Sequence, residues 1–159
     1  PPVSPVQPEG LYEETGQNEP GNSNFSWKDS TGDDRHRKSM YTYWKRMLLH
    51  PSLASFDAPS RQVCVTRRSV TNTPRQALVT LNDPIFHECA RYFADRIISS
   101  HSGKHQRLEY AFQTCLSRPP DAEERKMFLT FLAEEGEGAD RWVSVAAILL
   151  NLDETLTRE

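Results

Sequence analysis

The stretch "TPRQALVTLNDPIFHECARYFADRI", residues 73–97, contains two consecutive helix starts and decides the fold class. Thr73 stands before Pro74 and three positions before Gln76, which is the pattern of a capping box with proline at the first helical position. Asp83 stands before Pro84 in the same way, so we expect it to end the first helix and cap the second. Because no strand–helix–strand pattern accompanies these starts, the sequence predicts an all-α domain.

Apolar residues recur at helical spacing after each start. We expect the first helix to bury Ala77, Leu78 and Leu81, and the second to bury Ile85, Phe86, Ala90, Phe93, Ala94 and Ile97. Further helices are predicted at residues 107–117, at residues 125–135 behind an Asp-x-x-Glu capping box, and at residues 140–156. The last helix has a wide apolar surface and small residues at Ala146 and Ala147, which favour a central position.

The N-terminal part has weaker patterns. Residues 33–49 place Met40, Tyr43, Trp44, Met47 and Leu48 at helical spacing, although Tyr41 and Tyr43 also fit an alternating strand, and we favour the helix. Residues 51–70 are expected to form a loop with a short extended run at 63–66. Residues 1–32 are rich in Pro and Gly, with an optional edge strand at 24–30.

The predicted architecture is therefore an irregular helical domain of four to six helices at residues 33–159, preceded by an extended arm at residues 1–32. So long a stretch without regular structure is unusual within a compact domain. We expect the arm to pack on a neighbouring domain outside this chain. A first residue other than Met also suggests a piece of a longer protein.

The net charge of −3 excludes a globally basic nucleic-acid binder. The charge is nevertheless uneven, since residues 33–75 carry nine basic and three acidic side chains, a net of +6, between acidic flanks. This belt could attract an anion, or it could pair with the acidic segments of the chain itself, which is the interpretation we favour.

Three widely spaced cysteines form no metal or haem-attachment motif and are expected to be buried free thiols: Cys64, Cys89 and Cys115. No apolar run is long enough to cross a membrane. His101 and His105 have the i, i+4 spacing of a metal pair, but their loop-like surroundings argue against a metal site. We expect no cofactor in this chain.

The arginines around the first helix start are the strongest candidate site. A helix N-terminus offers free N–H groups and a partial positive charge, so it could bind sulfate, phosphate or carboxylate together with Arg67, Arg68, Asn72, Thr73 and Arg75. The alternative is a structural corner, in which an arginine pairs with Asp57 or Asp83 and Asn72 bonds the turn backbone. We favour the corner.

Trp44 could stack on a sugar ring, although aromatic residues at helical spacing are more often core. Nucleophile-elbow, phosphate-loop and dinucleotide motifs are absent from the sequence, and no catalytic residue is assigned.

Four stretches together carry a family resemblance: residues 32–46, 51–84, 111–124 and 149–159, which include "PSLASFDAPSRQVCVTRRSVTNTPRQALVTLNDP" and "AFQTCLSRPPDAEE". They resemble the C-terminal domain of large planctomycete proteins that carry a cytochrome c domain, known as domain-of-unknown-function family 1553. The resemblance implies an exported, extracytoplasmic parent protein. Haem would belong to another part of that parent, because this chain has no Cys-x-x-Cys-His motif.

The first functional hypothesis is a non-catalytic helical module that docks on other domains of the same parent protein. The second is a binding module for an anionic ligand, such as a sulfated polysaccharide, through the arginine cluster. The third is a part of an enzyme that other domains complete.

Overall fold

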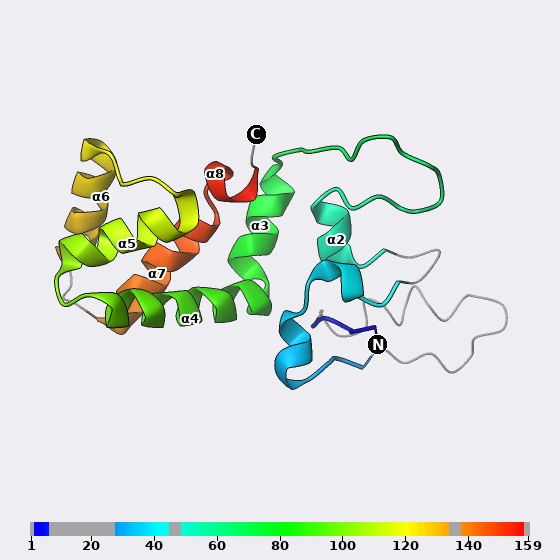
Figure 1. The fold of residues 1–159 in the computed structure, drawn as a ribbon, viewed down its shortest axis with the longest axis horizontal. Helices are drawn as coiled ribbons and strands as arrows, with labels where there is room; N and C mark the ends of the chain where they lie inside the picture. The colour runs from blue at the N-terminus through cyan, green and yellow to red at the C-terminus, as the bar shows by residue number, and fades with distance from the viewer. Residues whose placement is uncertain (1, 7–27, 45–48, 134–137, 158–159) are drawn as a thin grey trace. The chain divides into compact units, whose positions relative to one another are not determined.

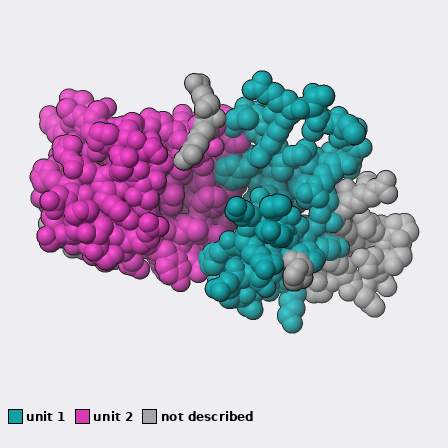
Figure 2. Space-filling model, viewed as in Figure 1, with its two compact units in different colours: residues 1–71 teal, residues 72–159 magenta. Residues whose placement is uncertain are grey.

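The chain divides into two compact units, residues 1–71 and residues 72–159 (Figure 2). The computed structural model describes residues 2–6, 28–44, 49–133 and 138–157. The predicted arm at residues 1–32 therefore lies largely outside the described residues, and its packing on a neighbouring domain stays a prediction.

The second unit is a bundle of helices, and the described residues of the chain contain no strand, so the predicted all-α class is confirmed (Figure 1). Its helices are α3 (Pro74–Asn82), α4 (Pro84–Ser100), α5 (Lys104–Leu116), α6 (Ala122–Ala133), α7 (Ala139–Leu150) and α8 (Asp153–Leu156).

The predicted helix starts are confirmed. The Thr73 side chain accepts a hydrogen bond from the backbone N–H of Gln76, whose side chain in return accepts from the N–H of Thr73. The Asp83 carboxylate accepts from the N–H of Ile85 at 2.8 Å. Asp121 and Glu124 exchange the two reciprocal bonds of a capping box at the start of α6.

The core of the second unit forms around α7, which contacts every other helix of this unit and packs most extensively on α4. The contact uses small residues that permit close approach, since Ala90, Ala94 and Ala146 are almost fully buried. On the other side of the core, the Phe112 and Phe128 rings meet edge to face with centroids 5.5 Å apart. The central position predicted for the last helix agrees with this packing.

The predicted last helix is divided in two. The α7 helix ends at Leu150, Asn151 has φ −100° and ψ 0°, and α8 begins at Asp153. Thr155 donates its hydroxyl to the carbonyl of Leu149, which replaces a helical backbone partner at this break. The continuous helix predicted over residues 140–156 was therefore wrong at its end.

The described residues of the first unit form the short 3-10 helices η1 (Gly32–His36) and η2 (Ser39–Tyr41) and the helix α2 (Pro51–Ser55). The predicted helix at residues 33–49 is wrong over its described part. Val3 pairs with Thr42 in a parallel bridge, and the backbone groups of Tyr41 and Tyr43 bond to Val3. This isolated bridge begins where η2 ends, at Thr42, so the alternative strand over Tyr41 and Tyr43 does not form either.

Other predictions for the first unit differ in detail. Residues 51–55, predicted as loop, form α2, because Pro51 suits a first helical position. The run at residues 63–66 pairs with no described strand. Met47 and Leu48 of the predicted helix lie outside the described residues. Residues 24–27 of the optional edge strand lie outside them as well.

Replacing Phe112 by Ala should lower the free energy of unfolding by about 3 to 5 kcal/mol, because a fully buried ring leaves a cavity among Phe128 and its neighbours. Met127→Ala is the control, since Met127 is 62% exposed and its loss should change stability by less than about 0.5 kcal/mol. Denaturant unfolding measures both. Equal losses in the two variants would contradict the placement of Phe112 in the core.

Candidate functional site

Arg68 holds the base of a long loop in the first unit. Asp57, with a left-handed φ of 57°, begins the loop, and its carboxylate accepts bonds from the N–H of Thr71 at 2.9 Å and from the Thr71 hydroxyl at 2.7 Å. The Arg68 guanidinium donates to the backbone carbonyls of Phe56 and Asp57. Arg68 therefore forms a structural corner, although it binds backbone oxygens rather than the predicted carboxylate.

Most hydrogen-bond donors at the start of α3, the predicted anion-binding terminus, have partners within the second unit or are absent. Asn72 donates its side-chain amide to the Asp153 carboxylate. Pro74 has no N–H, and the N–H of Gln76 is already bound by the Thr73 hydroxyl. These contacts remove most of the donors that an anion at this terminus would need.

Arg67 and Arg75 differ from the other members of the predicted cluster. Both are exposed, and neither makes a hydrogen bond or ion pair with another described residue. Arg67 and Arg68 belong to the first unit, whereas Asn72, Thr73 and Arg75 belong to the second. Anion binding by this cluster stays a prediction.

Trp44 is half-buried, and its ring face already has a cationic neighbour. The Arg61 guanidinium carbon lies 4.1 Å from the ring centroid, within cation–π range. Arg61 has a left-handed φ of 60°, a backbone state that the sequence did not reveal. Sugar stacking on Trp44 would have to displace or include this arginine, and it stays a prediction.

The α3 helix is oriented opposite to the prediction. Its polar residues Gln76 and Thr80 are buried, only 2% and 8% exposed, whereas Leu78 and Leu81 are 60% and 44% exposed. The predicted burial of these two leucines was therefore wrong. Polar groups face inward here because partners inside the unit satisfy them.

Two polar contacts fix this orientation. The Thr80 hydroxyl bonds to the Asn151 side chain at the break between α7 and α8, and Asn72 bonds to Asp153 at the start of α8. In Figure 1, α8 lies close to the start of α3. Turning the leucines inward would break both contacts and expose the Thr80 partner, so α3 keeps its apolar side chains outside.

Arg118, in the loop after α5, forms an ionic cluster with side chains of α6 and α8. Its guanidinium makes four hydrogen bonds of 2.8 to 2.9 Å to the carboxylates of Glu124 and Glu154. The same group lies 5.7 Å from the Phe112 ring centroid. The sequence predicted the Glu124 capping bond, but no local pattern indicated the pairing of Arg118 with Glu154, which is 36 residues away.

This cluster shifts the acidity of its members. Hydrogen bonds from Arg118 lower the pKa of both Glu124 and Glu154 below the ordinary value of 4.5. The same bonds raise the pKa of Arg118, so the guanidinium stays charged. Both carboxylates are consequently charged at neutral pH and hold the C-terminal helix to the start of α6.

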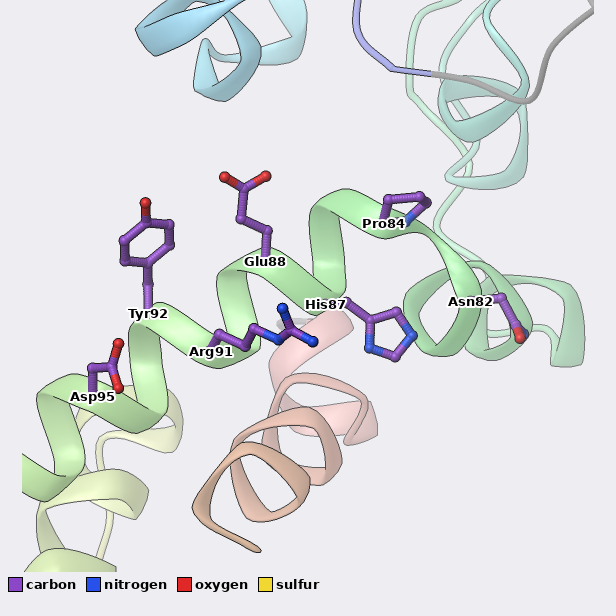
Figure 3. A pocket seen from close by; sticks show the side chains of 7 residues that line it. All are labelled: Asn82, Pro84, His87, Glu88, Arg91, Tyr92 and Asp95. Carbon is purple, nitrogen blue, oxygen red and sulfur yellow. The ribbon is translucent and has the colours of Figure 1, made fainter. Parts of the chain in front are cut away.

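A pocket lies against the outward face of α4 and the end of α3 (Figure 3). The side chains that line it are those of Asn82, Pro84, His87, Glu88, Arg91, Tyr92 and Asp95. Sequence reasoning did not identify these residues as the lining of one pocket. It missed the pocket because exposed polar residues at helical spacing ordinarily indicate a solvated helix face.

The structure also shows where the histidines considered as metal ligands lie. Within the described ranges, no three His, Cys, Asp or Glu side chains group as a metal site. His101 ends α4, and His105 lies in α5.

The three cysteines are free, but Cys64 and Cys89 are exposed, so their predicted burial was wrong. Partial burial raises the pKa of the Cys89 thiol, aided by the charges of Glu88 and Asp83.

Acid should weaken the Arg118 cluster. Because the folded pKa values of Glu124 and Glu154 are depressed, their stabilisation is fully present above their unfolded pKa and is lost as pH falls through the folded values. Arg118→Gln should therefore lower the free energy of unfolding most at neutral pH, and the difference from wild type should shrink below about pH 4.5.

Chemical unfolding at a series of pH values measures this difference. Lys126→Gln removes an exposed positive charge from α6 and serves as the control, with a profile parallel to that of wild type. A destabilisation by Arg118→Gln that is constant from neutral to acidic pH would show that the cluster acts only through packing on Phe112.

Comparison with known proteins agrees with the resemblance found in the sequence. Neither a curated protein nor a solved structure matches the chain. In the part of the chain that the structure describes, no helix is long and apolar enough to cross a membrane. A protein-family model matches residues 1–132, most of the chain, under the description PSD1, protein of unknown function (DUF1553). The chain belongs to this PSD1 family.

Proposed function

We propose that this chain is a non-catalytic docking module of a larger exported multidomain protein, and that it contacts another domain of that protein through α3. The observation that carries the proposal is the outward position of Leu78 and Leu81 on a helix whose polar face is buried. A helix that exposes its leucines has not covered its apolar side within the bundle.

The energy available at this surface is substantial. Full burial of a leucine side chain stabilises an association by about 1.5 to 3 kcal/mol. The contacts of Thr80 with Asn151 and of Asn72 with Asp153 hold the helix in place beforehand. A partner therefore meets a preformed surface and loses little free energy in ordering it.

The choice of partner in this proposal rests on the family resemblance. Domains of this kind resemble the last domain of large exported proteins with a cytochrome c domain, so the partner proposed is another domain of the same polypeptide. On this proposal, the module works outside the cytoplasm, and any haem of the parent protein binds in another domain.

The double variant Leu78→Ser/Leu81→Ser should weaken binding of this chain to the remainder of the parent protein, supplied as a separate polypeptide, by about 10- to 100-fold. Isothermal titration calorimetry measures the two affinities. Met127→Ser/Ile148→Ser is the matched control, because it removes exposed apolar side chains from α6 and α7.

Unchanged affinity of the Leu78/Leu81 variant would refute docking through α3. Self-association of the wild-type chain in sedimentation, abolished by the same variant, would assign the surface to a second copy instead. Circular dichroism must show native helix content in each variant, and surface substitutions of this kind are expected to preserve it.

A second proposal is an anion-binding function, supported by the exposure of Arg67 and Arg75 without partners among the described residues. A sulfated polysaccharide would then contact Arg67 in the first unit and Arg75 in the second, each as a separate point of attachment, as the net charge of residues 33–75 favours.

The test is the thermal midpoint of unfolding with and without heparin, used as the sulfated probe. A ligand that binds only the folded chain raises the midpoint. The rise should fall with added salt and should vanish in Arg67→Ala/Arg75→Ala, whose midpoint without heparin stays near that of wild type. Arg68→Ala should instead lower the midpoint without heparin, because it releases the carbonyls of Phe56 and Asp57. Absence of any rise in wild type would eliminate this function.

A further inference from the structure

The outward face of α4 presents an aromatic and polar surface that the core does not use. Tyr92 is 63% exposed, although a tyrosine ring has a large apolar area. It lies in the pocket together with His87, Glu88, Arg91 and Asp95 (Figure 3). An exposed ring beside several hydrogen-bonding side chains can contact a ligand that has both an apolar face and polar groups.

The helix that carries this surface is held rigidly. The opposite face of α4 buries Ala90, Phe93, Ala94 and Ile97 against the core. The helix is 17 residues long, and its packing against α7 fixes its rotation. The outward side chains therefore keep a constant spacing, as a binding surface requires.

The spacing places a ring between two carboxylates. Glu88, Tyr92 and Asp95 follow one another at intervals of four and three residues, which puts them along one side of the helix. Figure 3 shows Glu88 and Tyr92 projecting in the same direction, with Asp95 beside them. Arg91 and His87 form a second row, where the Arg91 guanidinium extends toward the His87 ring.

The charges of this surface almost cancel. Glu88 has a further partner within the chain, and the carboxylate of Asp95 is accompanied by the guanidinium of Arg91. Neither a strongly anionic nor a strongly cationic ligand gains much here. The surface instead offers an apolar ring face, bidentate acceptors and a bidentate donor close together.

A neutral sugar has the complementary chemistry. One face of a pyranose ring presents C–H groups that pack on an aromatic ring, and its vicinal hydroxyls both donate and accept hydrogen bonds. The carboxylate of Asp95 can accept from these hydroxyls, while Arg91 can donate to them. A polymer of such rings carries no charge, so its binding along the exposed helix has no charge-desolvation penalty.

We propose that the α4 surface formed by His87, Glu88, Arg91, Tyr92 and Asp95 binds a neutral polysaccharide chain, with Tyr92 as the stacking platform. This surface is separate from the leucines of α3, so the proposal does not depend on the docking function.

Affinity electrophoresis of the full 159-residue chain through gels containing galactomannan, xyloglucan or mixed-linkage β-glucan tests the proposal. At least one of these neutral polymers should retard wild type. Tyr92→Ala should weaken binding by about tenfold or more, whereas Tyr92→Trp should retain it, because the larger ring still stacks. Met127→Ala, an exposed change on α6, and Leu78→Ser/Leu81→Ser should bind as wild type does.

Retardation should persist when about 0.5 M NaCl is added, since no net charge holds the ligand. Three results would overturn the proposal: no retardation by any of the three polymers, retardation equal in Tyr92→Ala and wild type, or retention only by a charged polymer such as heparin. Native circular dichroism of Tyr92→Ala is expected because its ring is exposed, and the Tyr92→Trp result distinguishes lost stacking from lost fold.

Discussion

The close packing of α4 against α7 is the contact on which the rest of the second unit depends. Ala90 and Ala94 on one helix and Ala146 on the other are fully or almost fully buried, so the two backbones approach closely. Their small side chains let larger neighbours such as Phe93 and Val145 fill the remaining space. This packing fixes the rotation of α4, and it thereby determines that Tyr92 and the charged residues around it face outward.

Polar contacts then orient the elements that apolar packing leaves undetermined. The Thr80–Asn151 and Asn72–Asp153 hydrogen bonds turn the polar side of α3 inward, and Arg118 ties α6 and α8 together through two carboxylates. A buried polar group is costly without a partner, so these contacts outweigh the preference of two leucines for the interior. The result is an apolar surface on α3 and a mixed polar and aromatic surface on α4, which suit different kinds of partner.

Contacts within the chain also use two arginines of the positively charged segment at residues 33–75. Arg68 is used to bind carbonyls at the base of the 57–71 loop, where Asp57 also holds Thr71. Arg61 covers the ring of Trp44. Arginine is suited to such work because its planar fork donates several bonds and its charge is weakly hydrated. Arg61 and Arg68 of the positive belt at residues 33–75 therefore serve the architecture of the first unit, while Arg67 and Arg75 are exposed.

The sequence by itself determined the elements whose signals are local. Capping residues at Thr73, Asp83 and Asp121 act on N–H groups two or three residues away, and the apolar stripe of α4 repeats within a single helix, so both could be predicted. Only the tertiary structure decided which side of α3 is buried, where the last helix breaks, and which carboxylates Arg118 binds. Each of these depends on partners distant in the chain, such as Asn151 for Thr80 and Glu154 for Arg118, and no local pattern contains the identity of a distant partner.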